Sequence, residues 1–286
     1  MSAERRRLMA SPLRYPGGKG ALYARLRGVI RENGLAGCTY VEPFAGGAGA
    51  GLGLLVSGQV SKVVINDLDP AIYAFWKTLV DEPDAMIERV RKVPLNVKEW
   101  RRQKAVYATG GDGDLSKLGF ATFYLNRTNR SGVLNGGPIG GLDQTGNYLI
   151  DARFNRDDLA ERMRALSLFG KKIIVTRADG KAVVRKYASQ KNTFIYADPP
   201  YFEKAGSLYM NYFRQGDHAS LAAELNKKPT AHWLLTYDDV PQVEQLYRDR
   251  RIRRFGLHYS AHRVTKATEV VVLSDALNDI EDGWPS

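Results

Sequence analysis

Short apolar runs alternate along the chain with segments of helical periodicity, and this rhythm predicts an α/β fold. The runs of strand length are residues 39–41, 62–65, 172–176, 193–197, 233–236, 252–257 and 270–273. After the second run, Pro70 suits the first turn of a helix that carries Ile72, Phe75, Trp76 and Leu79. The last two runs are joined by a polar loop that is too short for a crossover helix. We therefore predict a doubly wound, mostly parallel sheet with an antiparallel edge hairpin.

The middle of the chain departs from this rhythm. From about residue 81 to residue 156, helical stretches are mixed with a loop rich in Gly and Asp at residues 110–114. The following segment, residues 126–148, is dense in Gly, Asn and Arg and shows no helical period. With 286 residues, the chain suits one large domain that carries an insert. We predict a domain made of residues 1–80 and 157–286, interrupted by a subdomain at residues 81–156.

Composition narrows the class of protein. A hydrophobic fraction of 44% and a charged fraction of 26% are typical of a globular chain, and they exclude disordered and collagen-like proteins. The single cysteine, Cys38, cannot form an internal disulfide or a CxxC zinc site, which favours an intracellular, cytoplasmic protein. The four histidines lack metal-ligand spacing, so we expect no metal site. The charged start has no apolar stretch after it, and no apolar run is long enough to predict a membrane span.

The charge balance adds a class of partner. Lysine and arginine number 42 against 31 acidic residues, which gives a net charge of +11. A basic excess of this size favours a polyanion as partner, most simply nucleic acid. The alternative is a basic surface that is only solvated.

A glycine-rich turn follows the first predicted strand, with the sequence Phe44-Ala45-Gly46-Gly47-Ala48-Gly49. Glycine lets the backbone approach a ligand closely because it has no Cβ. Asp67 ends the next strand, where an acid in nucleotide-binding folds accepts hydrogen bonds from ribose hydroxyls. The glycines do not have the Gly-x-Gly-x-x-Gly spacing that binds a pyrophosphate. A nucleoside without phosphates, such as S-adenosylmethionine, fits better, and its cationic sulfur suits a nearby acid such as Glu42.

A second motif, Asp198-Pro199-Pro200-Tyr201, follows the apolar run at residues 193–197. It therefore lies at the carboxyl end of a strand, where open α/β sheets bind ligands. Two successive prolines fix the backbone and remove two N–H donors, so the motif offers a carboxylate, carbonyl acceptors and an aromatic ring. This set suits a planar substrate that donates N–H bonds, such as a nucleobase amino group stacked on the tyrosine. The alternative is a tight turn that ends a strand.

Together these motifs resemble those of the Dam-like (D12 class) DNA adenine-N6 methyltransferases. Three further segments resemble motifs of that family: Leu13-Arg14-Tyr15-Pro16-Gly17-Gly18-Lys19 its N-terminal motif, Asn66-Asp67-Leu68-Asp69-Pro70 its ribose-binding segment, and residues 123–132 the start of its DNA-recognition region. The order of the motifs is that of the family, and they cover nearly the whole chain. The resemblance implies an S-adenosylmethionine-dependent methyltransferase sheet with an inserted DNA-recognition subdomain.

The resemblance also implies roles for individual residues. The cofactor S-adenosylmethionine would be bound by Tyr15, Gly17, Gly18, Lys19, Glu42, Phe44, Ala45, Gly46, Gly47, Asp67 and Asp179. The catalytic residues would be Asp198, Pro199, Pro200 and Tyr201. Double-stranded DNA would be bound by Asn126, Arg127, Asn129, Arg130 and Asn135, with Arg263 and Lys266 from a later basic loop. In one place the chain departs from the family: Gly180 stands where relatives often carry an aromatic residue.

The expected reaction is methyl transfer to the N6 amino group of an adenine that is flipped out of the DNA. Three alternatives share the fold: transfer to cytosine N4, transfer to adenine in RNA, and a DNA-binding relative without activity. Cytosine-N4 enzymes more often carry serine where Asp198 stands, which disfavours the first. Cytosine-C5 methylation needs a cysteine nucleophile after proline, and Cys38 does not have that setting.

Overall fold

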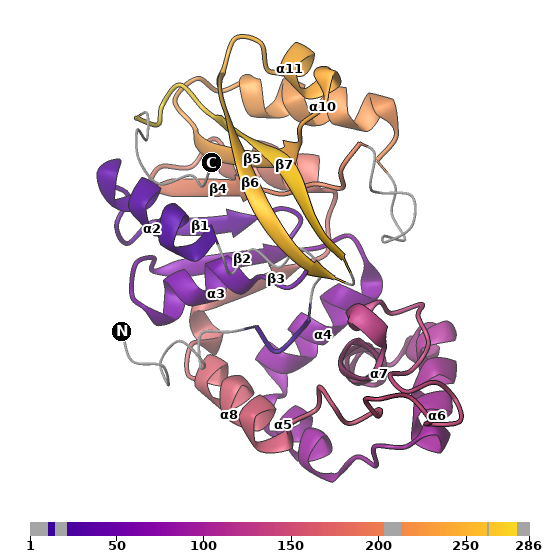
Figure 1. Cartoon of the computed structure of the whole chain (residues 1–286). Helices are drawn as coiled ribbons and strands as arrows, with labels where there is room; N and C mark the ends of the chain where they lie inside the picture. Colours follow the sequence, from indigo (N-terminus) through magenta and orange to yellow (C-terminus); the bar gives the residue numbers. More distant parts are fainter. Residues whose placement is uncertain (1–10, 15–21, 203–212, 262, 279–286) are drawn as a thin grey trace.

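The computed structural model describes residues 11–14, 22–202, 213–261 and 263–278, and its centre is a seven-stranded sheet (Figure 1). The strands are β1 (Thr39–Glu42), β2 (Lys62–Asn66), β3 (Ile173–Thr176), β4 (Thr193–Ala197), β5 (His232–Asp238), β6 (Arg251–Ala261) and β7 (Arg263–Leu273). Their order across the sheet is β3-β2-β1-β4-β5-β7-β6. Strands β1 to β5 are parallel, whereas β7 is antiparallel to both of its neighbours. The predicted doubly wound sheet with an antiparallel edge hairpin is confirmed.

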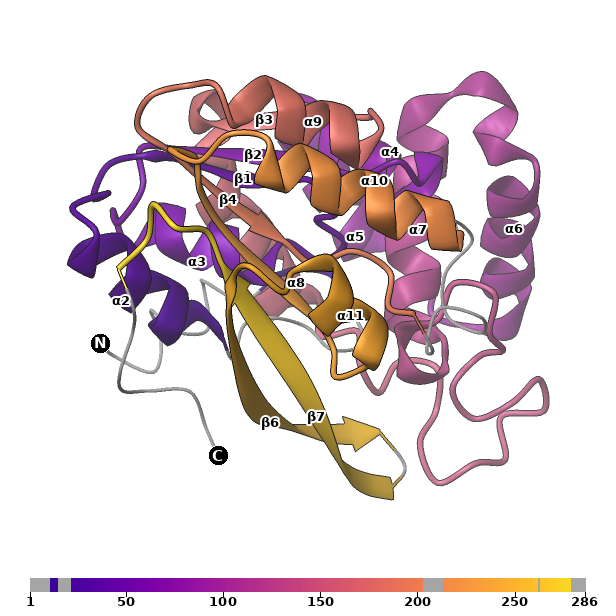
Figure 2. The ribbon, with the colours of Figure 1, turned by 90° about the horizontal axis from the view of Figure 1, so that it is seen from above.

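Helices cover both faces of the sheet (Figure 2). Side chains alternate between faces along a strand, so Tyr40 packs on one side of β1 and Val41 on the other. The face of Tyr40 is covered by α2 (Tyr23–Glu32), α3 (Gly49–Val56) and α4 (Pro70–Asp81). The face of Val41 is covered by α9 (Gly180–Tyr187), α10 (Gln215–Asn226) and α11 (Pro241–Leu246). Because both faces are buried, the central strands are almost continuously apolar.

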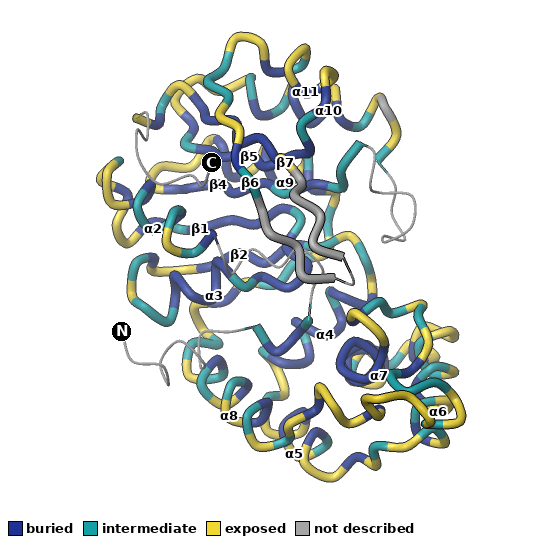
Figure 3. Tube along the Cα trace, viewed as in Figure 1, coloured by how far each residue is buried: buried dark blue, intermediate teal, exposed yellow. Residues whose placement is uncertain are grey.

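The connection from β2 to β3 holds a group of helices that extends beyond the sheet (Figure 1). It contains α4 and then α5 (Pro83–Lys92), α6 (Val97–Ala108), α7 (Leu115–Thr128) and α8 (Arg156–Ser167). Short 3₁₀ turns lie at Gly110–Gly113, Arg130–Gly132 and Gly170–Lys172. Helix α7 is buried along most of its length and packs against α4 and α6 (Figure 3). Within the described residues, no helix has both the length and the apolar character needed to cross a membrane.

Helices α4 and α7 approach each other unusually closely at one point. A Cβ added to Gly119 in α7 would lie 2.6 Å from the carbonyl oxygen of Ala74 and 2.6 Å from the hydroxyl of Thr78, both in α4. Only glycine fits there without moving the backbone of the neighbouring helix. Helix α4 is therefore shared, because it covers the sheet on one side and packs against α7 on another.

Two details of the sequence prediction were wrong. Residues 126–128, expected to lack helical structure, form the last turn of α7, which ends where Asn129 becomes extended. The helix continues because its residues are buried on all sides, so burial outweighs a polar composition. The polar loop expected between the two edge strands is also absent, since backbone pairing of β6 with β7 continues to Ala261 and Arg263. The β-branched residues Val264 and Thr265 in this stretch suit a strand.

Candidate active site

The two main motifs meet at the point where the strand order of the sheet reverses. Val41 of β1 pairs with Ile195 of β4, so the segments that follow these strands leave the same edge of the sheet side by side. From this position the chain runs outward through β2 and β3 in one direction and through β5 in the other. Ligands of open α/β sheets bind at such a switch point. The fold thus brings the glycine turn after β1 close to the Asp198 motif after β4.

The glycine turn is held from two sides. Gly46 has a φ of 47°, in the left-handed region, and its N–H donates to Oδ2 of Asp67 over 2.9 Å. The carbonyl oxygen of Gly46 accepts a 2.8 Å hydrogen bond from Nε1 of the buried Trp76 in α4. Ala48 also has a positive φ of 47° as the chain enters α3. Both the N–H and the carbonyl of Gly46 are thus anchored, which fixes the backbone of the turn at this residue.

Asn66 ties together the ends of three strands. Its amide nitrogen donates to the carbonyls of Pro43 (2.8 Å) and Ala178 (2.9 Å). Its amide oxygen accepts from the hydroxyl of Thr176 (2.8 Å) and from the backbone N–H of Ala178 (3.0 Å). The side chain is fully buried, so these bonds form in a low-dielectric setting where they hold most firmly. The sequence placed Asn66 in the segment that resembles the ribose-binding motif but assigned it no role of its own.

The carboxylate of Asp67 holds the glycine turn and also lies at the edge of the candidate site. Besides Gly46, it accepts a 3.0 Å hydrogen bond at Oδ1 from the backbone N–H of Asp69. Burial raises the pKa of Asp67 to about 6, although the two backbone donors act in the opposite direction. The side chain is half-buried. The carboxylate therefore shapes the backbone that a ligand would meet, and contact with a ribose stays a prediction.

Glu42, expected beside the cofactor, is buried beneath the turn. Its Oε1 accepts hydrogen bonds from the Tyr40 hydroxyl (3.0 Å) and from the N–H of Gly51 (3.2 Å). A Cβ on Gly51 would lie 2.8 Å from the Tyr40 ring, so glycine is needed for this packing. Burial, with a smaller contribution from the nearby charge of Asp198, raises the pKa of Glu42 to about 8. At neutral pH Glu42 is therefore mostly protonated, and the negative charge expected from the sequence is largely absent.

Two aromatic side chains, Phe44 and Phe213, pack together at the glycine turn. The ring of Phe44 lies over Gly180, where an added Cβ would be only 2.3 Å from Cε1 of that ring. Phe213 meets Phe44 edge to face, with 5.4 Å between ring centroids. Asp179 is exposed and caps α9 by accepting a 2.7 Å hydrogen bond from the N–H of Lys181. The space that a side chain at residue 180 would need is thus occupied by the ring of Phe44.

The Asp198 motif is anchored through its carboxylate. Oδ1 of Asp198 accepts a 2.7 Å hydrogen bond from the Thr236 hydroxyl in β5 and a 3.4 Å bond from the Tyr201 hydroxyl. Asp198 and Tyr201 are half-buried, and Pro199 between them is buried. The motif therefore presents a positioned carboxylate beside an aromatic ring at the sheet edge. Thr236 was not singled out from the sequence.

The residue after the motif is also fixed. The N–H of Phe202 donates to Oδ1 of Asp238 over 3.2 Å. The Phe202 ring stacks on His218 with 3.6 Å between centroids, and Nδ1 of His218 lies 2.8 Å from the Tyr237 hydroxyl. Burial lowers the pKa of His218, which keeps the imidazole neutral at pH 7. The rings of Phe202, His218 and Tyr237 thus pack together next to the motif.

Part of the predicted DNA-recognition segment has an internal role instead. Asn126 accepts from the N–H of Arg14 over 2.7 Å and donates to the carbonyl of the same residue over 2.6 Å, as a pairing strand would. Its amide also donates to the carbonyl of Gly132 over 3.0 Å. A Cβ on Gly132 would lie 2.7 Å from the carbonyl oxygen of Arg14. The last turn of α7 thereby holds Arg14, near the start of the N-terminal motif.

Arg127 and Asn129 extend this arrangement. Nε of Arg127 donates to the carbonyl of Pro12 over 2.6 Å, and burial lowers the pKa of this arginine to about 9. Asn129 accepts from Nε1 of Trp100 over 2.7 Å and donates to two backbone carbonyls. Both side chains are buried, as is that of Asn126. The polar groups of these three residues are engaged within the chain, which favours a role in holding the fold over the expected contact with DNA.

The other predicted DNA-binding residues are placed differently. Arg130 and Asn135 are exposed on the loop that follows α7. Arg263 and Lys266 lie in β7 by their backbone, but their side chains are outside those that the structure describes. Contact of these four residues with DNA stays a prediction. The cofactor residues expected in the N-terminal motif, Tyr15, Gly17, Gly18 and Lys19, lie outside the described residues.

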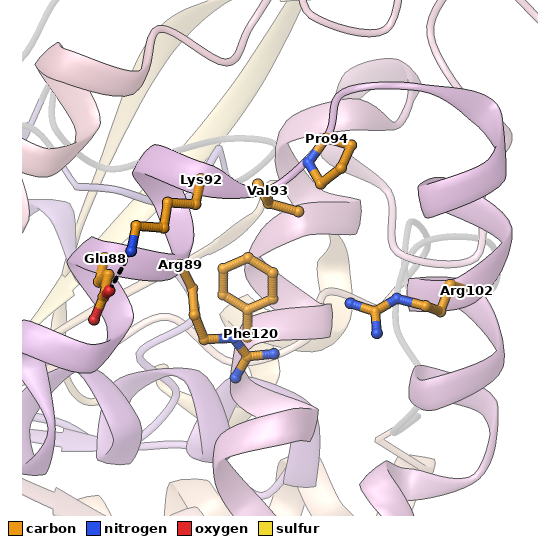
Figure 4. Close-up of a pocket in the computed structure, with 7 residues that line it drawn as sticks. All are labelled: Glu88, Arg89, Lys92, Val93, Pro94, Arg102 and Phe120. Carbon is orange, nitrogen blue, oxygen red and sulfur yellow. Dashed lines mark hydrogen bonds and ion pairs between the residues drawn. The ribbon is translucent and has the colours of Figure 1, made fainter.

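A shallow pocket of about 260 Å³ lies away from this site, among α5, α6 and α7 (Figure 4). Its basic side chains are engaged by the protein. The Arg89 guanidinium lies 3.9 Å from the centroid of Phe120, Lys92 pairs with Glu88 at 2.6 Å, and Arg102 pairs with a glutamate of its own helix. In the described part of the chain, no group of three His, Cys, Asp or Glu side chains is arranged to hold a metal ion.

Comparison with known proteins agrees with this geometry. The sequence model of the family described as D12 class N6 adenine-specific DNA methyltransferase matches residues 15–266. The chain is also similar to the Type II methyltransferase M.MjaIII of Methanocaldococcus jannaschii, with 25% identity over 234 residues. That match covers 75% of this chain and 79% of the relative. The family match spans the glycine turn, the helices between β2 and β3, and the Asp198 motif.

Proposed function

Because the chain belongs to the D12 class of N6 adenine-specific DNA methyltransferases, we propose that it transfers a methyl group from S-adenosylmethionine to the N6 amino group of an adenine flipped out of double-stranded DNA. One observation carries this proposal beyond the family name. The carboxylate of Asp198 is fixed by Thr236 at the end of β4, directly beside the anchored glycine turn that follows β1. A methyl donor in the turn and an amino group at Asp198 would thus be neighbours.

The residues around the turn fit S-adenosylmethionine. The backbone of Gly46 is held between Asp67 and Trp76. Because glycine has no Cβ, a ligand can approach this backbone closely. The spacing of the glycines does not match that of a pyrophosphate site. Phe44 supplies an apolar ring, and Asp67 supplies carboxylate oxygens at the end of β2 for ribose hydroxyls. We assign the same cofactor to the N-terminal motif at residues 15–19 and to Asp179. When bound, this cofactor supplies an electrophilic methyl group on a cationic sulfur.

The Asp198 motif would activate the amino group by accepting hydrogen bonds. The N6 lone pair of adenine is delocalised into the ring, which makes the nitrogen a poor nucleophile. Bonds from N6–H to the Asp198 carboxylate and to the Pro199 carbonyl favour a tetrahedral nitrogen with a more available lone pair. Prolines 199 and 200 keep these acceptors in place, so most of the rate comes from positioning. The proton leaves the nitrogen after methylation, when the nitrogen carries a positive charge.

The target base must leave the helix to reach this site. Flipping costs a few kcal/mol, and the ring of Tyr201 would offset part of that cost by stacking on the adenine. Tyr201 is held near Asp198 by its hydroxyl and leans on Tyr237 at 6.3 Å between centroids. The stacking surface and the hydrogen-bond acceptor thus belong to one rigid unit.

We assign DNA recognition to residues 81–156 and to the edge hairpin. The exposed residues Arg130 and Asn135 would face the DNA, together with Arg263 and Lys266, and the net charge of +11 would favour association with phosphates. Asn126 and Asn129 would act indirectly, by holding the loop that carries the first two, and Arg127 by holding the segment at Pro12. The similarity to a Type II methyltransferase favours a role in restriction–modification.

The test is the identity of the methylated nucleoside. Purified protein and S-adenosylmethionine with an isotopically labelled methyl group are incubated with double-stranded DNA or, separately, with RNA. The nucleic acid is digested, the nucleosides are identified by mass spectrometry, and DNA binding is measured on the same preparation. We expect label in N6-methyldeoxyadenosine. Label in N4-methyldeoxycytidine would instead establish cytosine as the acceptor. Label only in RNA would show that the substrate is RNA rather than DNA. DNA binding without any label would establish an inactive relative.

A further inference from the structure

The sheet register places Thr236 next to Asp198. Strands β4 and β5 are parallel, and their last registered pair is Ala197 with Leu235. The next residue on each strand, Asp198 and Thr236, therefore projects on the same side of the sheet from neighbouring strands. The Thr236 hydroxyl lies 2.7 Å from Oδ1 of Asp198, which is a short hydrogen bond typical of a hydroxyl with a carboxylate.

A third group joins this pair. The Tyr196 hydroxyl lies 2.9 Å from Oγ1 of Thr236, and Tyr196 and Thr236 are almost wholly buried. Burial raises the pKa of Tyr196 well above its usual value, and the nearby charge of Asp198 raises it further, so the phenol keeps its proton. Tyr196 and Asp198 lie two residues apart on one strand, so both point to the side of Thr236.

The direction of these hydrogen bonds follows from the chemistry of the three groups. An ionised carboxylate only accepts, so the single hydroxyl hydrogen of Thr236 must be donated to Asp198. The oxygen of Thr236 is then an acceptor, and the Tyr196 hydroxyl must donate to it. The result is a one-way chain from Tyr196 through Thr236 to Asp198. In such a chain each bond polarises the next, which strengthens the bond at the carboxylate.

We propose that Thr236, supported by Tyr196, is a positioning residue that fixes the rotamer of Asp198 and keeps its carboxylate a hydrogen-bond acceptor for the target amino group. This rests on the proposed function, in which Asp198 touches the substrate. Without the Thr236 hydroxyl the half-buried carboxylate can rotate and takes up a proton more readily.

Three variants separate this role from packing. Thr236→Val keeps the shape and removes the hydroxyl, Thr236→Ser keeps the hydroxyl and removes a methyl group, and Tyr196→Phe removes only the first donor. Methyl transfer is measured in single turnovers, with enzyme in excess and cofactor and DNA saturating, from pH 5.5 to pH 9. Affinities for S-adenosylmethionine and DNA, and urea unfolding, are measured on the same preparations.

For Thr236→Val we expect the rate to fall about 10-fold to 100-fold, as for loss of a hydrogen bond to a charged group, with both affinities changed less than 3-fold. The acid limb of its pH profile should move to higher pH. Thr236→Ser should recover most of the rate, and Tyr196→Phe should lose about 2-fold to 5-fold through the weakened second bond. Thr236→Val with a normal rate and pH profile would overturn the proposal.

The same holds if serine and valine are equally impaired, because the methyl group would then matter rather than the hydroxyl. If Thr236→Val does not fold, Tyr196→Phe decides: a normal rate and acid limb in that variant rejects the chain. The wild-type protein separates this inference from the proposed function. If it labels no adenine, the proposed function fails; if it labels adenine and the variants match it, only the positioning role fails.

Discussion

The ring of Phe44 lies so close over Gly180 that a Cβ on residue 180 would be 2.3 Å from Cε1 of the ring. Phe44 belongs to the turn after β1, and Gly180 begins α9 after β3, so the contact joins two parts of the candidate cofactor site. The absence of a side chain at residue 180 is what allows the ring to occupy this space. The two positions depend on each other, and this dependence can be tested.

We expect Gly180→Ala to weaken S-adenosylmethionine binding by about 1–3 kcal/mol, the usual cost of forcing a group into filled space. The added methyl group must displace Phe44 from its place beside the glycine turn. Isothermal titration calorimetry with the cofactor measures the loss. Gly216→Ala is the matched control, because a Cβ there meets nothing within 4 Å. Equal affinities of the two variants would remove Phe44 from the cofactor site.

Glu42 makes stability depend on pH in a direction opposite to that of most paired carboxylates. Its pKa is raised from 4.5 to about 8 by burial, so between these values the folded protein binds the proton more tightly than the unfolded chain. Stability contributed by this group is therefore lost as pH rises through that window. Glu42→Gln retains an acceptor for Tyr40 and Gly51 but cannot ionise.

We expect Glu42→Gln to be as stable as the wild type near pH 5 and more stable near pH 8, by on the order of a few kcal/mol. Urea unfolding at the two pH values gives the comparison, and Glu82→Gln serves as a control at an exposed carboxylate. A constant difference between wild type and Glu42→Gln at both pH values would contradict a buried, protonated Glu42.

Asn126→Ala should damage the fold rather than the reading of DNA. The variant leaves the N–H and carbonyl of Arg14 and the carbonyl of Gly132 without their partner, so we expect a loss of about 1–3 kcal/mol in the free energy of unfolding. Cofactor affinity should fall as well, because Arg14 leads directly into residues 15–19. Methylation of all DNA sites should decline in proportion. A stable variant with altered site preference would return Asn126 to base recognition.

Arg130→Ala should show the opposite pattern. The side chain is exposed, so folding and cofactor affinity should stay unchanged while DNA binding weakens. A phosphate contact would lower the slope of log K against log salt by about 1, whereas a base contact would relax the choice of site. Fluorescence anisotropy with labelled duplexes at several salt concentrations distinguishes the two. Unchanged DNA affinity and site choice would leave Arg130 a solvated residue.

Asp198→Ala should stop methyl transfer while sparing the fold and cofactor affinity. Loss of a preorganised electrostatic group costs on the order of 10²–10³ in rate, and kcat and kcat/KM should fall together. Asp198→Asn retains an acceptor oxygen without the charge and should keep some activity. Single-turnover rates give the comparison free of product release. Near-normal rates in the alanine variant would make the motif structural only.

The sheet was predictable because its strands are buried on both faces. The run at residues 193–197 is buried at every position and coincides with β4, and the two edge runs pair as expected. The role of buried polar residues was not predictable in the same way. Asn126 stands in a polar segment that looks like a solvated loop, and its partner Arg14 lies 112 positions away. Only the fold shows which polar side chains are enclosed.

The residues of the candidate site differ in the same way in how far the sequence predicts them. Local motifs indicated Phe44 and Asp198, because a ligand requires particular residues at strand ends. The residues that hold them gave weaker signals: Asn66 is one amide before Asp67, and Thr236 is one hydroxyl in the apolar strand β5. Their importance arises from neighbouring strands, so it depends on a register that spacing along the chain does not contain.

The close contact of α4 with α7 bears on attempts to change the target site by exchanging recognition segments between relatives. A junction at residue 81 would graft a foreign α7 onto the native α4. Any side chain at the position of Gly119 would then collide with Ala74 of α4. Misfit there would tilt α4 and shift Trp76, the donor that anchors Gly46. A transplanted segment would then arrive together with a displaced glycine turn. Helices α4 and α7 must therefore be exchanged together, and a working chimera needs its upstream junction before Pro70.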